Sequence, residues 1–177
     1  AAAGHSLGEY SALVAAGALP LGRAAAWVRE RGAAMQRAVP AGQGTMAAVL
    51  GMDDDRVVAL CAAASREAAQ TRAPDSEITV EPIVQAANFN APGQVVIAGA
   101  ADAVAAAIRL VKEAPEFKGG KALSLAVSAP FHCKLMAPAR ARMAEVFAQV
   151  KAAELAFPYV PNRTARLSRE PGLVLEL

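Results

Sequence analysis

The sequence predicts an α/β fold with two lobes, and three observations lead to this prediction. A serine lies between two glycines in the GHSLGEY stretch of residues 4–10, where a short strand would turn sharply into a helix. Residues 44–127 carry strand and helix patterns in the order β-α-β-β-α-β, which is the order of a split, ferredoxin-like unit. The composition, 55% hydrophobic and 19% charged over 177 residues, is that of a globular domain with a buried core.

The elements follow from periodicity, breakers and turn residues. Residues 9–16 are mostly good helix formers, and residues 21–39 form a second predicted helix that Pro40 and Gly42 end. The small lobe is expected to contain a strand at 45–50, a helix at 53–69, a polar loop at 70–82, a strand at 83–89, a turn at 90–93, a strand at 94–98, a helix at 101–114 and a strand at 121–127. A helix should then run to about residue 153, followed by an irregular or extended tail over 157–177.

Composition narrows the classes of function. A net charge of +2 without a cluster of lysine and arginine argues against nucleic-acid binding. No apolar run reaches the roughly 18 residues of a membrane span and no signal peptide is recognisable, so we expect a cytoplasmic protein. Cys61 and Cys133 should be reduced thiols, with no metal site. The chain begins with three alanines and no methionine, and we expect it to be a piece of something longer.

Ser6 is the first candidate nucleophile. In a G-x-S-x-G turn the glycines admit a strained backbone that presents the hydroxyl, and the amide N–H of the next residue, Leu7, can hold an oxyanion. The positive end of the following helix would stabilise negative charge at the same place. The alternative is a serine that simply caps an ordinary helix.

A serine hydroxyl needs a base, and the chain has only two histidines. His5 adjoins Ser6 and would point away from it across a tight turn. His132 follows a proline-bounded turn after a strand and is better placed, although it could also be a surface or helix-capping histidine. Cys133 could be proposed as a nucleophile, but its side chain should diverge from that of His132.

Arg31 lies in the middle of the apolar face of its predicted helix, between Trp27 and Met35. A guanidinium cannot be buried there without a partner, so it requires a carboxylate, a cavity or a route to solvent. Snorkelling from the edge of the core, or pairing with an internal acid, would explain it without any ligand.

Four motifs together resemble those of a known family, the malonyl-CoA:acyl carrier protein transacylases of fatty acid synthesis and the related acyltransferase domains of polyketide synthases. The GHSLGEY stretch is similar to the family's nucleophile motif, and RGAAMQ at residues 31–36 to its arginine segment. NFNAPGQVVIAG at residues 88–99 resembles its small-lobe hairpin, and SAPFHCKLM at residues 128–136 its histidine segment. Four motifs in the family's order are far more specific than any one of them.

The resemblance implies an α/β-hydrolase-like large lobe, residues 1–43 and 128–177, into which a ferredoxin-like small lobe, residues 44–127, is inserted. It also implies ping-pong transfer of a malonyl group from malonyl-CoA, through an ester on Ser6, to the phosphopantetheine thiol of acyl carrier protein, with His132 as base. CoA thioester is the substrate, and no metal or bound cofactor takes part. The partners implied are malonyl-CoA and acyl carrier protein, not nucleic acid or membrane.

The resemblance gives further residues a role in substrate binding. Arg31 would grip the free carboxylate of malonate in a bidentate pair, beside Met35, and so favour malonyl-CoA over acetyl-CoA. Phe131 would restrict space at the α-carbon and disfavour methylmalonyl groups. Asn90, with Asn88 nearby, would lie near the mouth of the site, although both could equally be turn residues of the hairpin. Docking of an acidic carrier protein would use basic residues, namely Lys118, Lys121, Lys134 or Arg140.

The sequence also departs from the family pattern. The family's glutamine-containing loop before the nucleophile, and a later segment whose carbonyl orients the histidine, are not recognisable. NRTA at residues 162–165 resembles the strand after the histidine helix, but residues 166–177 do not continue the pattern. Two other functions therefore stay open: a serine hydrolase or thioesterase that uses the same Ser-His pair, and a non-catalytic fragment of an acyltransferase.

Overall fold

The computed structural model describes residues 1–148 and 150–170, in which the chain forms two compact units. The first unit consists of Ala1–Ala34 and Arg140–Leu177, and the second of Met35–Ala139. Helix α2 (Leu21–Ala38) and helix α5 (Ala137–Phe147) each contribute residues to both units. Among the described residues, no helix is both long and apolar enough to cross a lipid bilayer.

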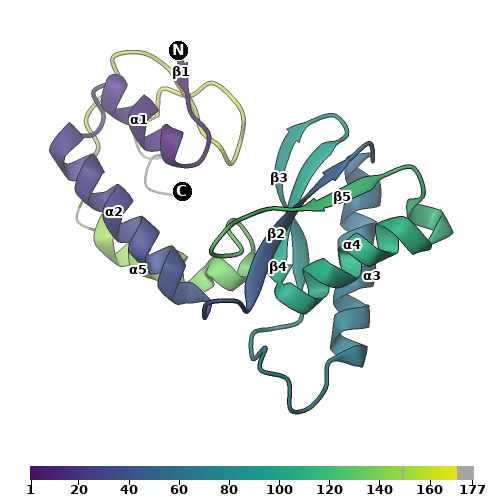
Figure 1. Cartoon of the computed structure of the whole chain (residues 1–177). Helices are drawn as coiled ribbons and strands as arrows, with labels where there is room; N and C mark the ends of the chain where they lie inside the picture. The colour runs from purple at the N-terminus through teal and green to yellow at the C-terminus, as the bar shows by residue number, and fades with distance from the viewer. Residues whose placement is uncertain (149, 171–177) are drawn as a thin grey trace. The chain divides into compact units, whose positions relative to one another are not determined.

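The second unit is an antiparallel four-stranded sheet with two helices. Its strands lie in the order β3-β4-β2-β5, and α3 and α4 pack along the sheet (Figure 1). Along the chain the elements follow one another as β-α-β-β-α-β: β2 (Gly44–Leu50), α3 (Asp54–Thr71), β3 (Val84–Ala91), β4 (Gln94–Ala100), α4 (Ala101–Glu113) and β5 (Lys121–Ser124).

Alternation along the strands supplies the core of this unit. Val49 of β2 and Ile97 of β4 point to the helical side, because successive side chains of a strand face opposite ways. They pack against Leu60 of α3 and Val104 of α4, all four of which are fully buried. Burial of one such side chain contributes about 1.5–3 kcal/mol, and the many buried alanines allow the helices to approach the sheet closely.

The β3–β4 hairpin is tighter than the sequence indicates. β3 continues to Ala91 and β4 begins at Gln94, so the predicted turn over 90–93 narrows to Pro92 and Gly93. Gly93 has φ 72°, a left-handed conformation that glycine adopts without steric cost. Asn90 consequently belongs to the end of a strand, where it is exposed.

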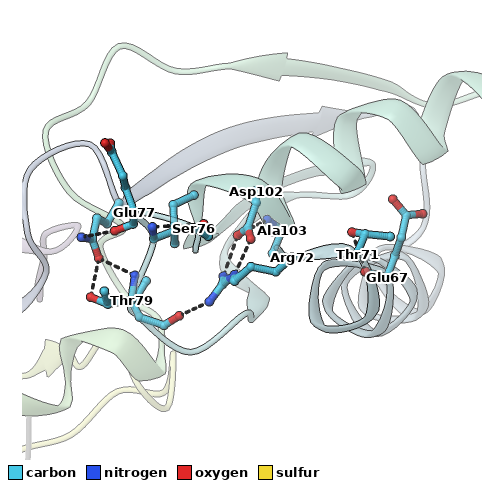
Figure 2. A network of polar contacts seen from close by, with 11 residues as sticks. Glu67, Thr71, Arg72, Ser76, Glu77, Thr79, Asp102 and Ala103 are labelled. Carbon is cyan, nitrogen blue, oxygen red and sulfur yellow. Dashed lines mark hydrogen bonds and ion pairs between the residues drawn. The ribbon is translucent and has the colours of Figure 1, made fainter. Parts of the chain in front are cut away.

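An arginine anchors the loop between α3 and β3. The Arg72 guanidinium donates from Nε and Nη2 to the Asp102 carboxylate, at 2.6 and 2.8 Å, and from Nη1 to the carbonyl of Val80 at 2.5 Å (Figure 2). Asp102 lies in the first turn of α4, where a carboxylate is also favoured by the helix dipole. One side chain therefore joins the end of α3, the start of α4 and the loop between them.

The first unit places a short parallel sheet beside a helix. β1 (Ala2–Ala3) pairs in parallel with β6 (Tyr159–Val160), and α1 (Leu7–Ala15) follows β1 after only three residues. An aromatic cluster fills the core, in which Trp27 meets Phe147 edge to face at a centroid distance of 5.7 Å. Tyr159 is fully buried in the same cluster.

The end of the chain differs from the prediction. Helix α5 ends at Phe147 rather than near residue 153, and β5 ends at Ser124 rather than 127. Residues 150–158 form no helix or strand, and the N–H groups of Ala153 and Ala156 donate to the carbonyls of Ala18 and Ala16. These tertiary hydrogen bonds outweigh the helix propensity of the alanines. Of the predicted irregular tail, residues 171–177 lie outside the described residues.

The Arg72–Asp102 pair should make folding stability depend on pH. Burial alone would raise the pKa of Asp102, but the hydrogen bonds and charge of Arg72 outweigh burial and hold this pKa below its ordinary value. A depressed folded-state pKa adds stability above the unfolded value, near 3.9, which is lost as pH falls through the folded value. Asp102→Asn should lower the free energy of unfolding at pH 7 by about 1–2 kcal/mol, measured by urea denaturation.

The same comparison at about pH 3 should give a smaller difference between the two proteins, because the stability contributed by ionised Asp102 begins to be lost once pH falls below the unfolded-state pKa, near 3.9. Asp75→Asn, which changes an exposed carboxylate in the same loop, is the control and should leave the free energy of unfolding nearly unchanged. An equal loss in both variants would contradict the anchoring role of Asp102.

Candidate active site

Ser6 occupies a strained turn between β1 and α1. Its backbone has φ 53° and ψ −106°, a conformation that residues with a side chain rarely adopt. Such a conformation costs about 1–3 kcal/mol, so the surrounding structure has to hold it. A serine raised on a sharp turn between a strand and a helix has the geometry of a nucleophile elbow.

Close backbone packing explains the first glycine of the motif. A Cβ atom on Gly4 would lie 2.0 Å from the carbonyl oxygen of Gly8, so any other residue would push the strand and the helix apart. Gly8 is different, because a Cβ on it would meet nothing within 4 Å. Steric overlap therefore excludes a side chain at Gly4, whereas the position of Gly8 has room for one.

Leu7 begins helix α1, and its N–H is one of the amides that a helix leaves without an intrahelical partner. The next two amides, those of Gly8 and Glu9, donate to the carbonyls of His5 and Ser6 at 2.9 and 3.1 Å. The Leu7 amide at the positive end of α1 is thus suited to receive an oxyanion formed next to Ser6.

Arg31 reaches the candidate nucleophile directly. From helix α2, its Nη2 atom donates a hydrogen bond of 2.9 Å to Ser6 Oγ. The side chain is half-buried, as its position on the apolar face of the helix predicts. A guanidinium has five N–H donors in a planar fork, so a contact with Ser6 leaves others for a second acceptor.

A buried acid and an asparagine complete the surroundings of the turn. Glu9 is only 4% exposed, and its Oε1 accepts the backbone N–H of Asn162 at 3.2 Å. Burial raises the pKa of Glu9, although the Asn162 hydrogen bond and the Arg31 charge both oppose the rise. The Asn162 side chain accepts the Ser6 N–H at 2.6 Å and donates to the Gly4 carbonyl at 2.6 Å. Sequence reasoning assigned no role to either residue.

His132 lies in the second unit, on a turn of its own. It also has a left-handed backbone, φ 62°, and its side chain is exposed. Neighbouring residues fix this turn: the Lys134 N–H donates to Gln85 Oε1 at 2.7 Å, and Lys134 Nζ pairs with Glu81 at 2.9 Å. Before His132 in the chain, the Pro130 ring is fully buried against the backbone of β2.

The other predicted site residues also belong to the second unit. Met35 is buried, Phe131 is half-buried beside His132, and Asn90 is exposed at the end of β3. The Cys133 thiol donates to the Pro130 carbonyl at 3.2 Å, and burial raises the pKa of this thiol. A raised pKa reduces the thiolate fraction, which makes Cys133 a poor nucleophile.

The predicted site residues are divided between the two units. Ser6, Leu7 and Arg31 meet in the first unit, while Met35, Asn90, Phe131 and His132 belong to the second. The partnership of Ser6 and His132 thus stays a prediction. Within residues 1–148 and 150–170, no group of three or more histidine, cysteine, aspartate or glutamate side chains is arranged to hold a metal ion.

The turn geometry defines a class, the α/β proteins that present a serine at a nucleophile elbow with a cationic hydrogen-bond donor beside it. Comparison with known proteins makes the class more specific. The family model described as "Acyl transferase domain" matches residues 1–174. The chain belongs to this acyl transferase domain family.

Relatives and solved structures agree with this assignment. The malonyl CoA-acyl carrier protein transacylase of Bacillus subtilis is 43% identical over 175 residues, which cover 98% of this chain and 50% of that protein. The crystal structure of acyl-carrier-protein S-malonyltransferase from Burkholderia pseudomallei matches with a TM-score of 0.83 and 44% identity, over 98% of this chain and 51% of that one. This chain therefore has the same mixed α/β fold as the Burkholderia pseudomallei structure.

A third match is a malonyl-transacylase solved in complex with a type II PKS acyl-carrier protein, with a TM-score of 0.81 and 40% identity over 98% of this chain and 51% of that chain. The chain thus spans about half the length of the relatives that it matches.

The two glycines of the elbow give a matched test of its geometry. Gly4→Ala should destabilise the protein by several kcal/mol or prevent folding, because the added methyl group overlaps the Gly8 carbonyl. Gly8→Ala should be neutral or stabilising by about 0.4–1 kcal/mol, because its methyl group enters open space within a helix. Thermal unfolding of both variants measures the difference, and equal melting temperatures would mean that the close approach at Gly4 does not exist in solution.

Proposed function

We propose that this chain carries the acyl-transfer machinery of a malonyl-CoA:acyl carrier protein transacylase, with Ser6 as nucleophile and His132 as base. The observation that carries the proposal is the 2.9 Å hydrogen bond from Arg31 to Ser6 Oγ, made at a left-handed turn. It places a cation suited to a carboxylate next to the hydroxyl that would be acylated. The names of the relatives support the same reaction.

The reaction would proceed in two transfers through an ester on Ser6. In the first, His132 accepts the Ser6 proton as Oγ attacks the thioester carbon of malonyl-CoA, and the oxyanion is held by the Leu7 amide. The C–S bond then breaks, and CoA leaves as a thiol with the proton from His132. In the second, His132 takes the proton of the phosphopantetheine thiol as its sulfur attacks the ester carbon. The C–Oγ bond then breaks, and His132 returns the proton to Ser6 Oγ.

Arg31 would select the acyl group. One methylene separates the two carbonyl carbons of malonate, so a malonyl ester on Ser6 carries its free carboxylate close to the guanidinium that contacts Oγ. An acetyl group would leave that cation without an acceptor, at a cost of about 1–3 kcal/mol. Met35 and Phe131 would line the acyl pocket, and Asn90 its mouth.

The lobes and partner belong to the same proposal. Residues 44–127 would form the ferredoxin-like small lobe inserted into an α/β-hydrolase-like large lobe of residues 1–43 and 128–177, a division that the β-α-β-β-α-β order of the second unit supports. Acyl carrier protein is the proposed acceptor, since a similar malonyl-transacylase was solved in complex with one. The cytoplasmic location stays a prediction.

Intact mass measurement tests the nucleophile. Incubation of the purified protein with malonyl-CoA should add the mass of one malonyl group, and Ser6→Ala should abolish the addition. Cys133→Ala is the control for thiol chemistry and should retain the adduct, because burial keeps this thiol protonated. An adduct that survives Ser6→Ala but not Cys133→Ala would overturn the assignment of Ser6.

The fate of the acyl group separates a transferase from a hydrolase. With holo acyl carrier protein present, the acyl-enzyme should decay to malonyl-acyl carrier protein much faster than to free malonate. Free malonate as the main product under those conditions would identify the chain as a thioesterase with the same serine.

Substitution of Arg31 tests the choice of acyl group. Arg31→Ala should lower the ratio of kcat/KM for malonyl-CoA to that for acetyl-CoA by about 10²-fold, because the carboxylate loses a charged, bidentate partner. Arg31→Lys should recover only part of this ratio, since an ammonium group lacks the fork geometry. Arg29→Ala removes an exposed arginine of the same helix and should leave the ratio unchanged. A ratio that is unaffected by Arg31→Ala would rule out the carboxylate role.

A further inference from the structure

The Ser6 turn is bridged by a side chain that lies 156 residues later in the sequence. Asn162 follows directly after Pro161 and β6, and the parallel pairing of Ala3 with Val160 brings this part of the chain beside the elbow. Its Oδ1 accepts the Ser6 N–H and its Nδ2 donates to the Gly4 carbonyl, each at 2.6 Å. One planar amide thus binds the backbone on both sides of His5.

The asparagine is itself held in place. Its backbone N–H donates to Glu9 Oε1 at 3.2 Å, and Glu9 is buried in the first turn of α1. The loop after β6 therefore connects to Gly4 just after β1, to Ser6 in the turn and to Glu9 in the helix that follows. These contacts surround a residue whose left-handed backbone needs such support.

We infer that Asn162 is a positioning residue, which acts through the Ser6 backbone to keep the hydroxyl in its reactive orientation. The inference rests on the proposed function, in which Ser6 is acylated. Only an amide offers a donor and an acceptor in this arrangement, since a carboxylate at neutral pH has acceptors alone and would oppose the Gly4 carbonyl. The Asn162 contact also occupies the Ser6 amide, which leaves the oxyanion to the Leu7 amide.

Replacement of the amide by an alkyl group of similar shape tests this role. Asn162→Leu should slow the first acylation of Ser6 by malonyl-CoA by about 10- to 100-fold. The malonyl-CoA concentration that gives half the maximal rate should change little. Quenched-flow mass spectrometry measures both quantities. Thr164→Ala, an exposed position two residues away, should react at the wild-type rate. Acylation of Asn162→Leu at the wild-type rate would overturn the inference.

A second probe separates this inference from the proposed function. Labelling of Ser6 by a fluorophosphonate requires a reactive serine but no malonyl recognition. If malonyl-CoA gives no adduct in any variant while labelling still slows in Asn162→Leu, the proposed function fails and the positioning role stands. If wild-type protein forms the malonyl adduct and both rates are unchanged in Asn162→Leu, the positioning role fails alone.

Asn162→Asp gives a readout that a purely structural role would not change, and it serves if the leucine variant does not fold. At pH 7 the introduced carboxylate keeps the acceptor but lacks the donor, and labelling should be slow. Protonation restores an O–H donor toward the Gly4 carbonyl. The ratio of variant to wild-type rate should therefore rise as pH falls from 7 to about 4.5, toward the ordinary aspartate pKa.

Because the variant's labelling rate is divided by the wild-type rate, pH effects from groups that both proteins share cancel in the ratio. Thr164→Asp controls for added negative charge, and its ratio should stay flat over the same range. A flat ratio for Asn162→Asp, or an equal rise in both variants, would show that donation to Gly4 has no role in Ser6 reactivity.

Discussion

The left-handed backbone of Ser6 is the constraint on which the first unit depends. A cost of about 1–3 kcal/mol is similar to what two hydrogen bonds return, at about 0.5–1.5 kcal/mol each. The Asn162 amide supplies two, to the Ser6 N–H and the Gly4 carbonyl, so the strain is offset locally. The approach of Gly4 to the Gly8 carbonyl then fixes how closely β1 and α1 meet.

The second unit also contains a residue with a left-handed backbone, His132, and supports it by different contacts. The His132 turn is fixed by contacts to two strands: Lys134 binds Gln85 of β3, whereas Leu125 donates to Met46 of β2 and the Pro130 ring packs on Gly44 at the start of β2. A rigid sheet with two packed helices is therefore the scaffold of the histidine, whereas the serine depends on a few hydrogen bonds. Each candidate catalytic residue thus has a support built from the unit in which it lies.

Local patterns predicted the local elements well. The start of α2 at Leu21 and of α4 at Ala101 agree with the pattern, because helix periodicity and Pro or Gly breakers are encoded within a few residues. The end of α5 was wrong, since it depends on hydrogen bonds from Ala153 and Ala156 to residues more than 130 positions earlier. Those partners cannot be seen in a window of sequence.

In the candidate site, too, features encoded within a few residues were predicted, whereas contacts between distant residues were not. Glycine spacing indicated the turn at Ser6, and an arginine on an apolar helix face indicated that Arg31 needed a partner, but neither pattern identified Ser6 Oγ as that partner. Asn162 belonged only to a stretch that resembles a family strand and had no predicted chemical role, whereas in the structure it follows β6 as a loop residue. The one available indication was Glu9 in the GHSLGEY stretch, because a glutamate that becomes buried requires a hydrogen-bond donor from elsewhere in the chain.

Glu9 and Arg31 show how the site keeps its cation available. The charge of Arg31 favours ionised Glu9, but burial has the larger effect and raises the pKa of Glu9, whose Oε1 accepts the backbone N–H of Asn162. Arg31 instead donates to Ser6 Oγ, which is neutral. The acceptor that Arg31 contacts therefore carries no charge, and in the proposed function an anionic acyl group on Ser6 would be the counterion of this guanidinium.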